Sequence, residues 1–360
     1  MKKLMFPGTF LLGNDILKDF VKNASCFGKK FVFIGDEISL SVSRDQLTDS
    51  FKGSDCQCEF VLGGKLCCTS EVNRLAALKE VKDADVICAV GGGGSMDISK
   101  AIAFEAGKAL VMVPTTASSD APCTFATLRY SEDGSHIISD YMHFKCPDMV
   151  MIDTRIVANA PCRLIAAGMG DAMATWYEGS TCYKNKKLGS SITETAMALC
   201  QMCKTIIQRD GLAAYEAVTA KVVTPQLENV VEANCFLSSM GGLNSGNACC
   251  HGFGDWLASV DGGHDFLHGE RVFVGLILQM ILEKYPMDEI LDMMKFGRKV
   301  GLPICVGDVT KENLESVAKR ASEELQNDHF MVNLNCDFTP NILSGSILYA
   351  QYLADNLSDK

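Results

Sequence analysis

The stretch VICAVGGGGSMDISKA, residues 86–101, decides the fold. Its first five residues are apolar and predict a short buried strand, and the polar residues after the glycines predict a helix that opens at Met96 or Asp97. Glycines let a backbone approach a pyrophosphate closely, and a helix N-terminus offers free N–H groups. A strand, a glycine loop and a helix in this order therefore predict a phosphate-binding cradle. The alternative, a flexible turn, is less favourable because four successive glycines lose much backbone entropy.

Strands and helices alternate on both sides of this stretch. Apolar runs typical of strands lie at 30–34, 86–90 and 110–113, and helical patterns lie at 72–81 and 97–105. The run at 149–152 follows a turn-rich segment, 131–134, which predicts a hairpin. Residues 1–155 therefore predict a layered α/β domain with a parallel sheet.

After residue 155 the pattern changes. Apolar residues recur at helical spacing in six stretches, 190–209, 228–240, 269–282, 287–300, 311–325 and 342–357. Residues 156–360 therefore predict a second domain that is mainly helical.

The composition favours a small-molecule partner. The 33 basic and 44 acidic residues give a net charge of −11, which argues against binding to nucleic acid or to an anionic membrane. The longest apolar run, 272–282, is too short to span a bilayer. Pro7 and Gly8 interrupt the apolar start, so we expect a cytoplasmic protein whose seventeen cysteines are reduced.

Asp36 follows the predicted strand at 30–34. A carboxylate at this position accepts hydrogen bonds from the adenosine ribose hydroxyls and repels a 2′-phosphate, which favours NAD over NADP. The alternative is that Asp36 only caps the next helix.

Histidine is rare in this chain, with six residues at His136, His143, His251, His264, His268 and His329. Three of them lie in the glycine-rich segment 247–269, and the carboxylate Asp171 lies in the conspicuous segment 167–172. One aspartate oxygen and two imidazoles with an open fourth position suit a catalytic divalent metal such as zinc, although spacing alone does not select the trio. Gly262 and Gly263 indicate a loop around His264. The other three histidines are given no function.

Five segments together resemble the glycerol dehydrogenase branch of the iron-type, or metal-dependent, alcohol dehydrogenase superfamily: GGGGSMDISKA (91–101), PTTASSDAP (114–122), GDAMATWYE (170–178), VEAN (231–234) and HGERV (268–272). The resemblance covers essentially the whole chain. It implies an N-terminal Rossmann-like domain, residues 1–155, and a helical domain for metal and substrate, residues 156–360, with the active site between them.

The resemblance also assigns residues. Asp171, His251 and His268 fall on the positions that hold the metal, and Asp120 matches a carboxylate beside the substrate hydroxyls. Thr175 stands where the iron-binding branch has a further histidine, so the resemblance implies zinc rather than iron. The positions implied for NAD are Asp36, Gly92, Gly93, Gly94, Ser95, Asp97, Thr115, Thr116, Thr124, Ala126 and Tyr130.

Two positions depart from the family. Gly94 stands where many members have a lysine, which weakens any cationic contact to the pyrophosphate, and Gly254 replaces a histidine. Near the glycine loop the sequence offers only three cations, Lys100, Lys108 and Arg129.

The expected reaction is the NAD-dependent interconversion of a small polyol or vicinal diol and its carbonyl form. The favoured substrate pair is glycerol and dihydroxyacetone. The alternatives are a glycerol-1-phosphate dehydrogenase or another reductase of small polar alcohols and aldehydes. A lyase similar to dehydroquinate synthase is less favoured, because it needs a cluster of cations around a sugar phosphate. A binding protein without activity is disfavoured because all three metal positions hold competent ligands. We expect a homo-oligomer with no nucleic-acid or membrane partner.

Overall fold

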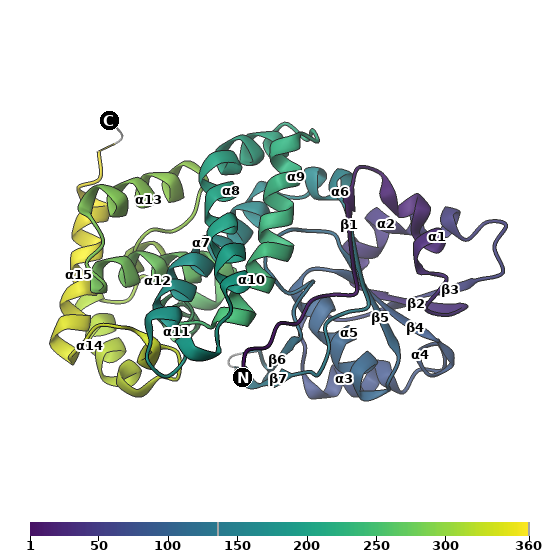
Figure 1. Ribbon diagram of the computed structural model, residues 1–360, viewed down its shortest axis with the longest axis horizontal. Helices are drawn as coiled ribbons and strands as arrows, with labels where there is room; N and C mark the ends of the chain where they lie inside the picture. Colours follow the sequence, from purple (N-terminus) through teal and green to yellow (C-terminus); the bar gives the residue numbers. More distant parts are fainter. Residues whose placement is uncertain (135–136, 359–360) are drawn as a thin grey trace.

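The computed structural model describes residues 1–134 and 137–358, and it has a sheet-containing half beside a helical half (Figure 1). The sheet is parallel and six-stranded, in the order β1-β8-β5-β4-β2-β3. Its strands are β1 (Thr9–Gly13), β2 (Lys30–Gly35), β3 (Gln57–Leu62), β4 (Val86–Gly91), β5 (Ala109–Pro114) and β8 (Met149–Asp153). His136 lies outside the described residues.

Helices cover both faces of the sheet, which explains why its strands are continuously apolar. Phe31 and Phe33 of β2 pack in one cluster with the first helices of the chain, and Val32 and Ile34 pack on the opposite face. The first face is covered by a 3-10 turn (Ile16–Asp19), α1 (Phe20–Ala24) and α2 (Glu37–Ser50), and the second by α3 (Thr69–Ala76), α4 (Lys79–Asp83) and α5 (Gly93–Glu105).

The predicted single helix at 72–81 is wrong, because α3 ends at Ala76 and α4 begins at Lys79. Between them Leu78 has an extended backbone, with φ −63° and ψ 144°. Leu75 and Val81 are both buried against the same core, although six residues in one helix would turn them about 120° apart. The break therefore lets both side chains reach the sheet.

The strand order reverses beside the glycine loop. From β2 the chain runs outward to β3, whereas from β4 it runs to β5 on the other side. The crevice at the carboxyl ends of β2 and β4 is where ligands bind in folds of this class. The predicted helix start at Met96 or Asp97 is wrong: α5 begins at Gly93, because the first helical turn tolerates glycine.

A small antiparallel hairpin follows β5. Its strands are β6 (Ala126–Tyr130) and β7 (Ile137–Met142), which pair on either side of the segment predicted to turn at 131–134. This pairing confirms the predicted hairpin.

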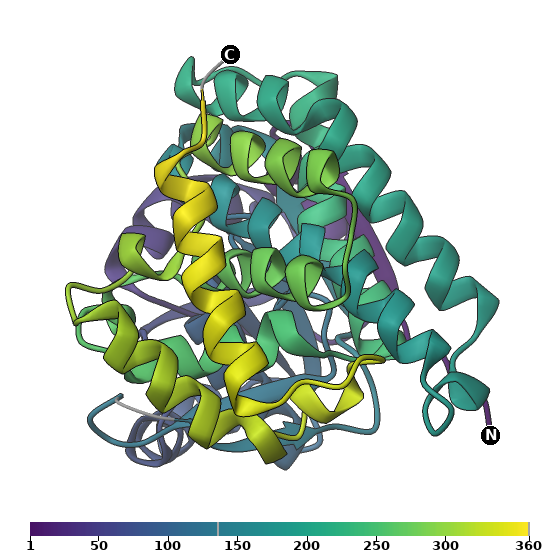
Figure 2. The same cartoon turned by 90° about the vertical axis from the view of Figure 1, so that its left-hand side faces the viewer.

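The helical half contains ten α-helices within the described residues, α6 (Thr154–Asn159), α7 (Cys162–Lys184), α8 (Glu194–Thr219), α9 (Pro225–Glu232), α10 (Ser238–Ser245), α11 (Cys249–Trp256), α12 (His268–Leu282), α13 (Met287–Lys299), α14 (Leu314–Glu324) and α15 (Pro340–Asp355). A π-helical turn (Ala233–Leu237) joins α9 to α10, so the stretch predicted to be helical at 228–240 is helical throughout but not a regular α-helix. Figure 2 shows α15 running across the outer face of this half. In the described part of the chain, no helix has both the length and the apolar character needed to cross a membrane.

The two halves are joined close to the carboxyl edge of the sheet. The Asn234 side chain donates a hydrogen bond to the carbonyl of Ala117, in the segment after β5, at 2.9 Å. Ser239 of α10 donates to the carbonyl of Asp120 in the same segment. This segment therefore carries residues from the sheet edge into contact with the helices.

Candidate active site

Three side chains meet where α7, α11 and α12 adjoin. The Asp171 Oδ1 atom lies 3.4 Å from His251 Nε2 and 3.8 Å from His268 Nε2. One donor atom from each residue lies within 4.8 Å of the other two, and over residues 1–134 and 137–358 no other trio of acidic, histidine or cysteine side chains is so arranged. One carboxylate oxygen and two imidazole nitrogens form a donor set suited to a divalent metal.

Two glycines bring these helices together. A Cβ atom on Gly170 would lie 2.4 Å from the carbonyl oxygen of Gly269, and a Cβ on Gly269 would lie 1.9 Å from the carbonyl oxygen of Ala167. The backbones of α7 and α12 therefore touch beside Asp171 and His268. Any side chain at either glycine would push the two helices, and with them the two ligands, apart.

A carboxylate lies beside the Nδ1 atom of each imidazole ring, on the side away from Asp171. Glu178 Oε2 lies 2.6 Å from His251 Nδ1, and Glu178 Oε1 accepts the backbone N–H groups of Ala248 and His251 at 2.8 and 2.9 Å. Asp255 Oδ1 lies 3.4 Å from His268 Nδ1. Glu178 is within hydrogen-bond distance of His251 Nδ1, whereas Asp255 Oδ1 is at ion-pair distance from His268 Nδ1 without a hydrogen bond. Both Nε2 atoms lie on the side of Asp171, and a carboxylate behind the ring is the arrangement that orients histidine for metal binding.

The charges of the cluster stabilise one another. Burial acts to raise the pKa of Asp171, but the hydrogen bond from His251 and the charges of both histidines hold this pKa below its usual value. Burial likewise acts to lower the pKa of His251, but the charge of Glu178 raises it well above its usual range. The Asp171 carboxylate is therefore ionised, and the imidazoles must release a proton before they can bind a metal.

Asp120 lies beside the cluster, in the segment that follows β5. Its backbone N–H donates to Asp171 Oδ2 at 3.3 Å. Burial and the charge of Asp171 raise the pKa of the Asp120 carboxyl to about 6. The structure thus brings together Asp120, Asp171, His251 and His268, all four residues that the sequence analysis placed in the catalytic set.

The remaining histidines lie elsewhere in the described residues. His264 is in a 3-10 turn with its side chain 70% exposed, and the His329 side chain is 72% exposed. His143 Nε2 lies 2.7 Å from Thr127 Oγ1.

Gly254 and Thr175 stand at positions where the resemblance leads one to expect a histidine in other proteins, and the structure shows what surrounds each of them. A Cβ on Gly254 would lie 2.9 Å from the backbone N and Cα of Val272, so α11 packs directly on α12 there. Thr175, one turn after Asp171, is buried and its hydroxyl lies 2.9 Å from that of Ser238. Neither position adds a ligand to the trio.

A cavity of about 770 Å³ lies at the carboxyl edge of the sheet and extends to the helical half. This volume is in the range of small-molecule and cofactor sites, about 300–1,000 Å³. The four cluster residues do not line it, but Leu267 and Ser118 do, and they are next to His268 and two residues from Asp120 in the sequence. The predicted coenzyme residues that line it are Asp36, Gly92, Gly93, Gly94, Ser95, Thr115 and Thr116.

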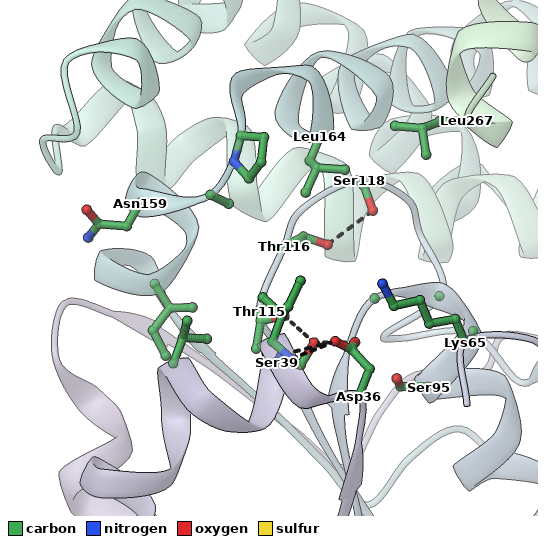
Figure 3. A pocket seen from close by; sticks show the side chains of 18 of the residues that line it. Asp36, Ser39, Lys65, Ser95, Thr115, Thr116, Ser118, Asn159, Leu164 and Leu267 are labelled. Carbon is green, nitrogen blue, oxygen red and sulfur yellow. Dashed lines mark hydrogen bonds between the residues drawn. The ribbon is translucent and has the colours of Figure 1, made fainter. Parts of the chain in front are cut away.

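Asp36 lines the cavity and also caps a helix. Its Oδ1 accepts the N–H groups of Ile38 and Ser39 at 3.0 and 3.3 Å, and its Oδ2 accepts the Ser39 hydroxyl at 2.7 Å (Figure 3). Burial acts to raise the pKa of Asp36, but these hydrogen bonds keep it below the usual value. The helix-cap interpretation therefore holds, and the carboxylate that caps α2 also faces the cavity.

Four predicted coenzyme residues do not line this cavity. Three of them surround the amino group of Lys100, which is fully buried and donates to Asp97 Oδ1 at 3.0 Å, to Thr124 Oγ1 at 2.7 Å and to the Ala126 carbonyl at 2.8 Å. Tyr130 is the fourth, and its backbone N–H donates to the carbonyl of Cys67. Because a buried ammonium needs such partners, Lys100 links α5 to the strand β6 rather than serving as a free cation.

The expectation about nearby cations is also wrong. Lys108 donates to three backbone carbonyls around residues 81–84, and Arg129 pairs with Glu105. The cations that line the cavity are Lys65 and Arg155, which the sequence analysis did not single out.

Sequence reasoning also missed Glu178 and Asp255 as partners of the histidines. Both carried a signal, since Glu178 lies seven residues after Asp171 and Asp255 four residues after His251. These spacings place each carboxylate on the same helix face as a ligand.

Known proteins are similar to this chain over most of its length. A family model described as iron-containing alcohol dehydrogenase matches residues 7–154. A glycerol dehydrogenase of Thermotoga maritima is 35% identical over 335 residues, covering 90% of this chain and 91% of the relative. A glycerol dehydrogenase of Escherichia coli is 33% identical over 353 residues, covering 96% and 95%. The crystal structure of a probable glycerol dehydrogenase from Sinorhizobium meliloti superposes with a TM-score of 0.90 at 28% identity, covering 99% of this chain and 100% of that one.

Proposed function

This chain belongs to the iron-containing alcohol dehydrogenase family, within its glycerol dehydrogenase branch, and we propose that its substrate pair is glycerol and dihydroxyacetone. As a member of that branch it is a metal-dependent, NAD-linked oxidoreductase of small polyols. The observation that carries the substrate proposal is Asp120, whose backbone N–H donates to Asp171 and whose carboxyl group is acted on by the charges of Asp171, His251 and His268.

The trio fits a divalent metal. The two Nε2 atoms and one carboxylate oxygen converge, and the Nδ1 atoms are held by Glu178 and Asp255. A bound metal supplies Lewis acidity towards the alcohol oxygen, and bound NAD supplies a hydride acceptor. We propose zinc rather than iron, since Thr175 is occupied with Ser238 and leaves three protein ligands, the number typical of catalytic zinc sites.

The chain's own residues select and orient the substrate. Asp120 accepts a hydrogen bond from the hydroxyl next to the reacting one, which favours vicinal diols because a buried carboxylate without a partner is costly. Asp36 excludes a 2′-phosphate by its charge and thereby selects NAD. We assign residues 1–155 to coenzyme binding and residues 156–360 to metal and substrate, and we propose a cytoplasmic homo-oligomer.

The test is to strip the metal, restore zinc, iron or manganese separately, and follow NADH formation with glycerol, propane-1,2-diol, butane-2,3-diol and simple alcohols. We expect activity with zinc and the fastest turnover on vicinal diols. Asp120→Ala should reduce turnover of glycerol more than that of a monohydroxylic alcohol, and equal losses would refute the role of Asp120. Release of phosphate from a sugar phosphate without net NADH would instead identify the lyase.

A further inference from the structure

A lysine side chain lies across the glycine loop. In Figure 3 the Lys65 side chain extends along the loop, and its amino end is on the side of Thr116 and Ser118, within the cavity lining. Lys65 belongs to the connection between β3 and α3, far in sequence from the glycine loop. We propose that Lys65 is the cation that binds a phosphate of the coenzyme at this loop, an inference that rests on the NAD-linked function above.

The backbone around Lys65 is held in place by neighbouring elements. The N–H of Gly63 donates to the carbonyl of Gly35, at the end of β2, at 2.9 Å. The N–H of Gly64 donates to Glu71 Oε1 in α3 at 2.6 Å. The connection is therefore anchored to the sheet edge on one side and to a helix on the other, which places Lys65 reproducibly over the cavity.

The backbone of Lys65 packs directly against Gly94. A Cβ atom built on Gly94 would lie 1.8 Å from the carbonyl oxygen of Lys65, so the Lys65 backbone occupies the space that a side chain at position 94 would need. A lysine could not stand at Gly94 without displacing this connection. The packing that excludes a side chain at position 94 therefore also brings the backbone of Lys65 next to the glycine loop.

The amino group of Lys65 is free to meet an anion. In the described part of the chain it forms no hydrogen bond and no ion pair within 4.0 Å, although its charge lowers the pKa of Asp36 across the cavity. Arg155, the other cation of the cavity, lies 3.9 Å from the carboxylate of Asp15. The first N–H groups of α5 have no partner within that helix, because it begins at Gly93. Free N–H groups and a free ammonium beside one loop are complementary to a phosphate group.

The experiment compares ligands that differ in their phosphates. Binding of NADH, ADP-ribose, adenosine and NADPH to the metal-loaded protein is measured by calorimetry for the wild type, Lys65→Met, Lys65→Arg and Arg155→Met. Lys79→Met is the matched control, because it removes an exposed lysine of the same half outside the cavity.

We expect Lys65→Met to weaken ADP-ribose and NADH about tenfold, the size of one charge-assisted hydrogen bond, and to change adenosine binding less than about twofold. Lys65→Arg should keep most of the affinity, and added salt should weaken the wild type more than Lys65→Met. Unchanged ADP-ribose binding in Lys65→Met would overturn the inference, as would a loss confined to NADPH or to Arg155→Met. A wild type that binds neither NADH nor ADP-ribose would overturn the proposed coenzyme function itself.

A double-mutant cycle tests the pairing with Gly94. Gly94→Ala should weaken ADP-ribose binding because its Cβ displaces the Lys65 backbone, and it should add little once Lys65 is already methionine. Fully additive losses would show that Gly94 acts independently of Lys65.

Discussion

Replacing Glu178 with glutamine tests whether the outer carboxylate orients His251. The substitution keeps an oxygen to accept the N–H groups of Ala248 and His251, but it removes the charge 2.6 Å from His251 Nδ1. If the amide N–H₂ group faces Nδ1, the ring must accept there and carry its proton on Nε2, the atom that faces Asp171. The ring would then be unable to donate its lone pair towards the metal position.

The expected loss of metal affinity is about 10- to 100-fold, or about 1.4–2.7 kcal/mol. This agrees with the loss of one charge-assisted hydrogen bond, about 1.5–3 kcal/mol. The metal-free protein is titrated with zinc in competition with a chromophoric chelator. Glu289→Gln is the matched control, because Glu289 also accepts hydrogen bonds from buried neighbours, Tyr177 and Lys204, but lies outside the cluster.

A Glu178→Gln protein that binds zinc within about threefold of the wild type would refute the orienting role. For this comparison the thermal unfolding midpoint of metal-free Glu178→Gln must equal that of metal-free Glu289→Gln. A midpoint that is lower in both the metal-free and the metal-loaded Glu178→Gln protein would indicate a general packing defect.

Three further predictions concern stability and coenzyme choice. Burial lowers the pKa of His143 from 6.5 to about 4, so the unfolded state binds more protons than the folded state between these pH values, and the free energy of unfolding falls as the pH drops through this window. The expected fall is about 1–2 kcal/mol after allowing for the partial exposure of the ring. Denaturant unfolding between pH 7 and pH 4 should show a weaker pH dependence of this free energy in His143→Gln than in the wild type. Gly168→Ala would place a Cβ 1.9 Å from the carbonyl oxygen of Ala117 and should lower the free energy of unfolding in urea by at least about 2–3 kcal/mol. Gly242→Ala would place a Cβ with nothing within 4 Å and should raise this free energy by about 0.5–1 kcal/mol, because alanine favours the helix α10 more than glycine does. Asp36→Asn keeps an oxygen to cap α2 but removes the charge that repels a 2′-phosphate, so the ratio of kcat/KM for NADP to that for NAD should rise about tenfold; an unchanged ratio contradicts the selective role.

The metal trio shows how a long-range site assembles from local elements. Asp171, His251 and His268 lie in three separate helices, and nothing in their spacing links the first to the other two. α7 and α12 meet because Gly170 and Gly269 allow backbone contact, and α11 packs on α12 at Gly254. The resemblance to a family identified the trio, whereas the residues alone provided only a set of candidates.

The cysteines illustrate the opposite case, because their unusual number suggests a special function whereas the structure shows most of them as packing residues. All seventeen are free, and most are buried among apolar side chains. Cys249 and Cys250 are next to His251, but the Cys249 thiol lies 3.9 Å from the carbonyl of Gly275 and the Cys250 thiol 3.2 Å from Gln279 Oε1, and neither belongs to the trio.

The sequence by itself determined the parts that depend on local pattern. The apolar strand before Gly91, the glycines after it, and the helical periodicity after residue 155 predicted a parallel sheet and a helical half, because alternation and helical spacing record which faces are buried. The same local reasoning failed at the break between α3 and α4, where two short helices replace the single predicted one.

Only the tertiary structure decided which distant groups meet. The contacts of Lys65 with Gly94, of Glu178 with His251, and of Lys100 with Thr124 and Ala126 join segments that lie 24 to 73 residues apart. Such contacts depend on how helices and loops pack around one another. The residues that flank one member of a pair in the sequence do not indicate where the other member lies. The chemistry of each side chain is therefore readable from the sequence, whereas its partner is a property of the packed chain.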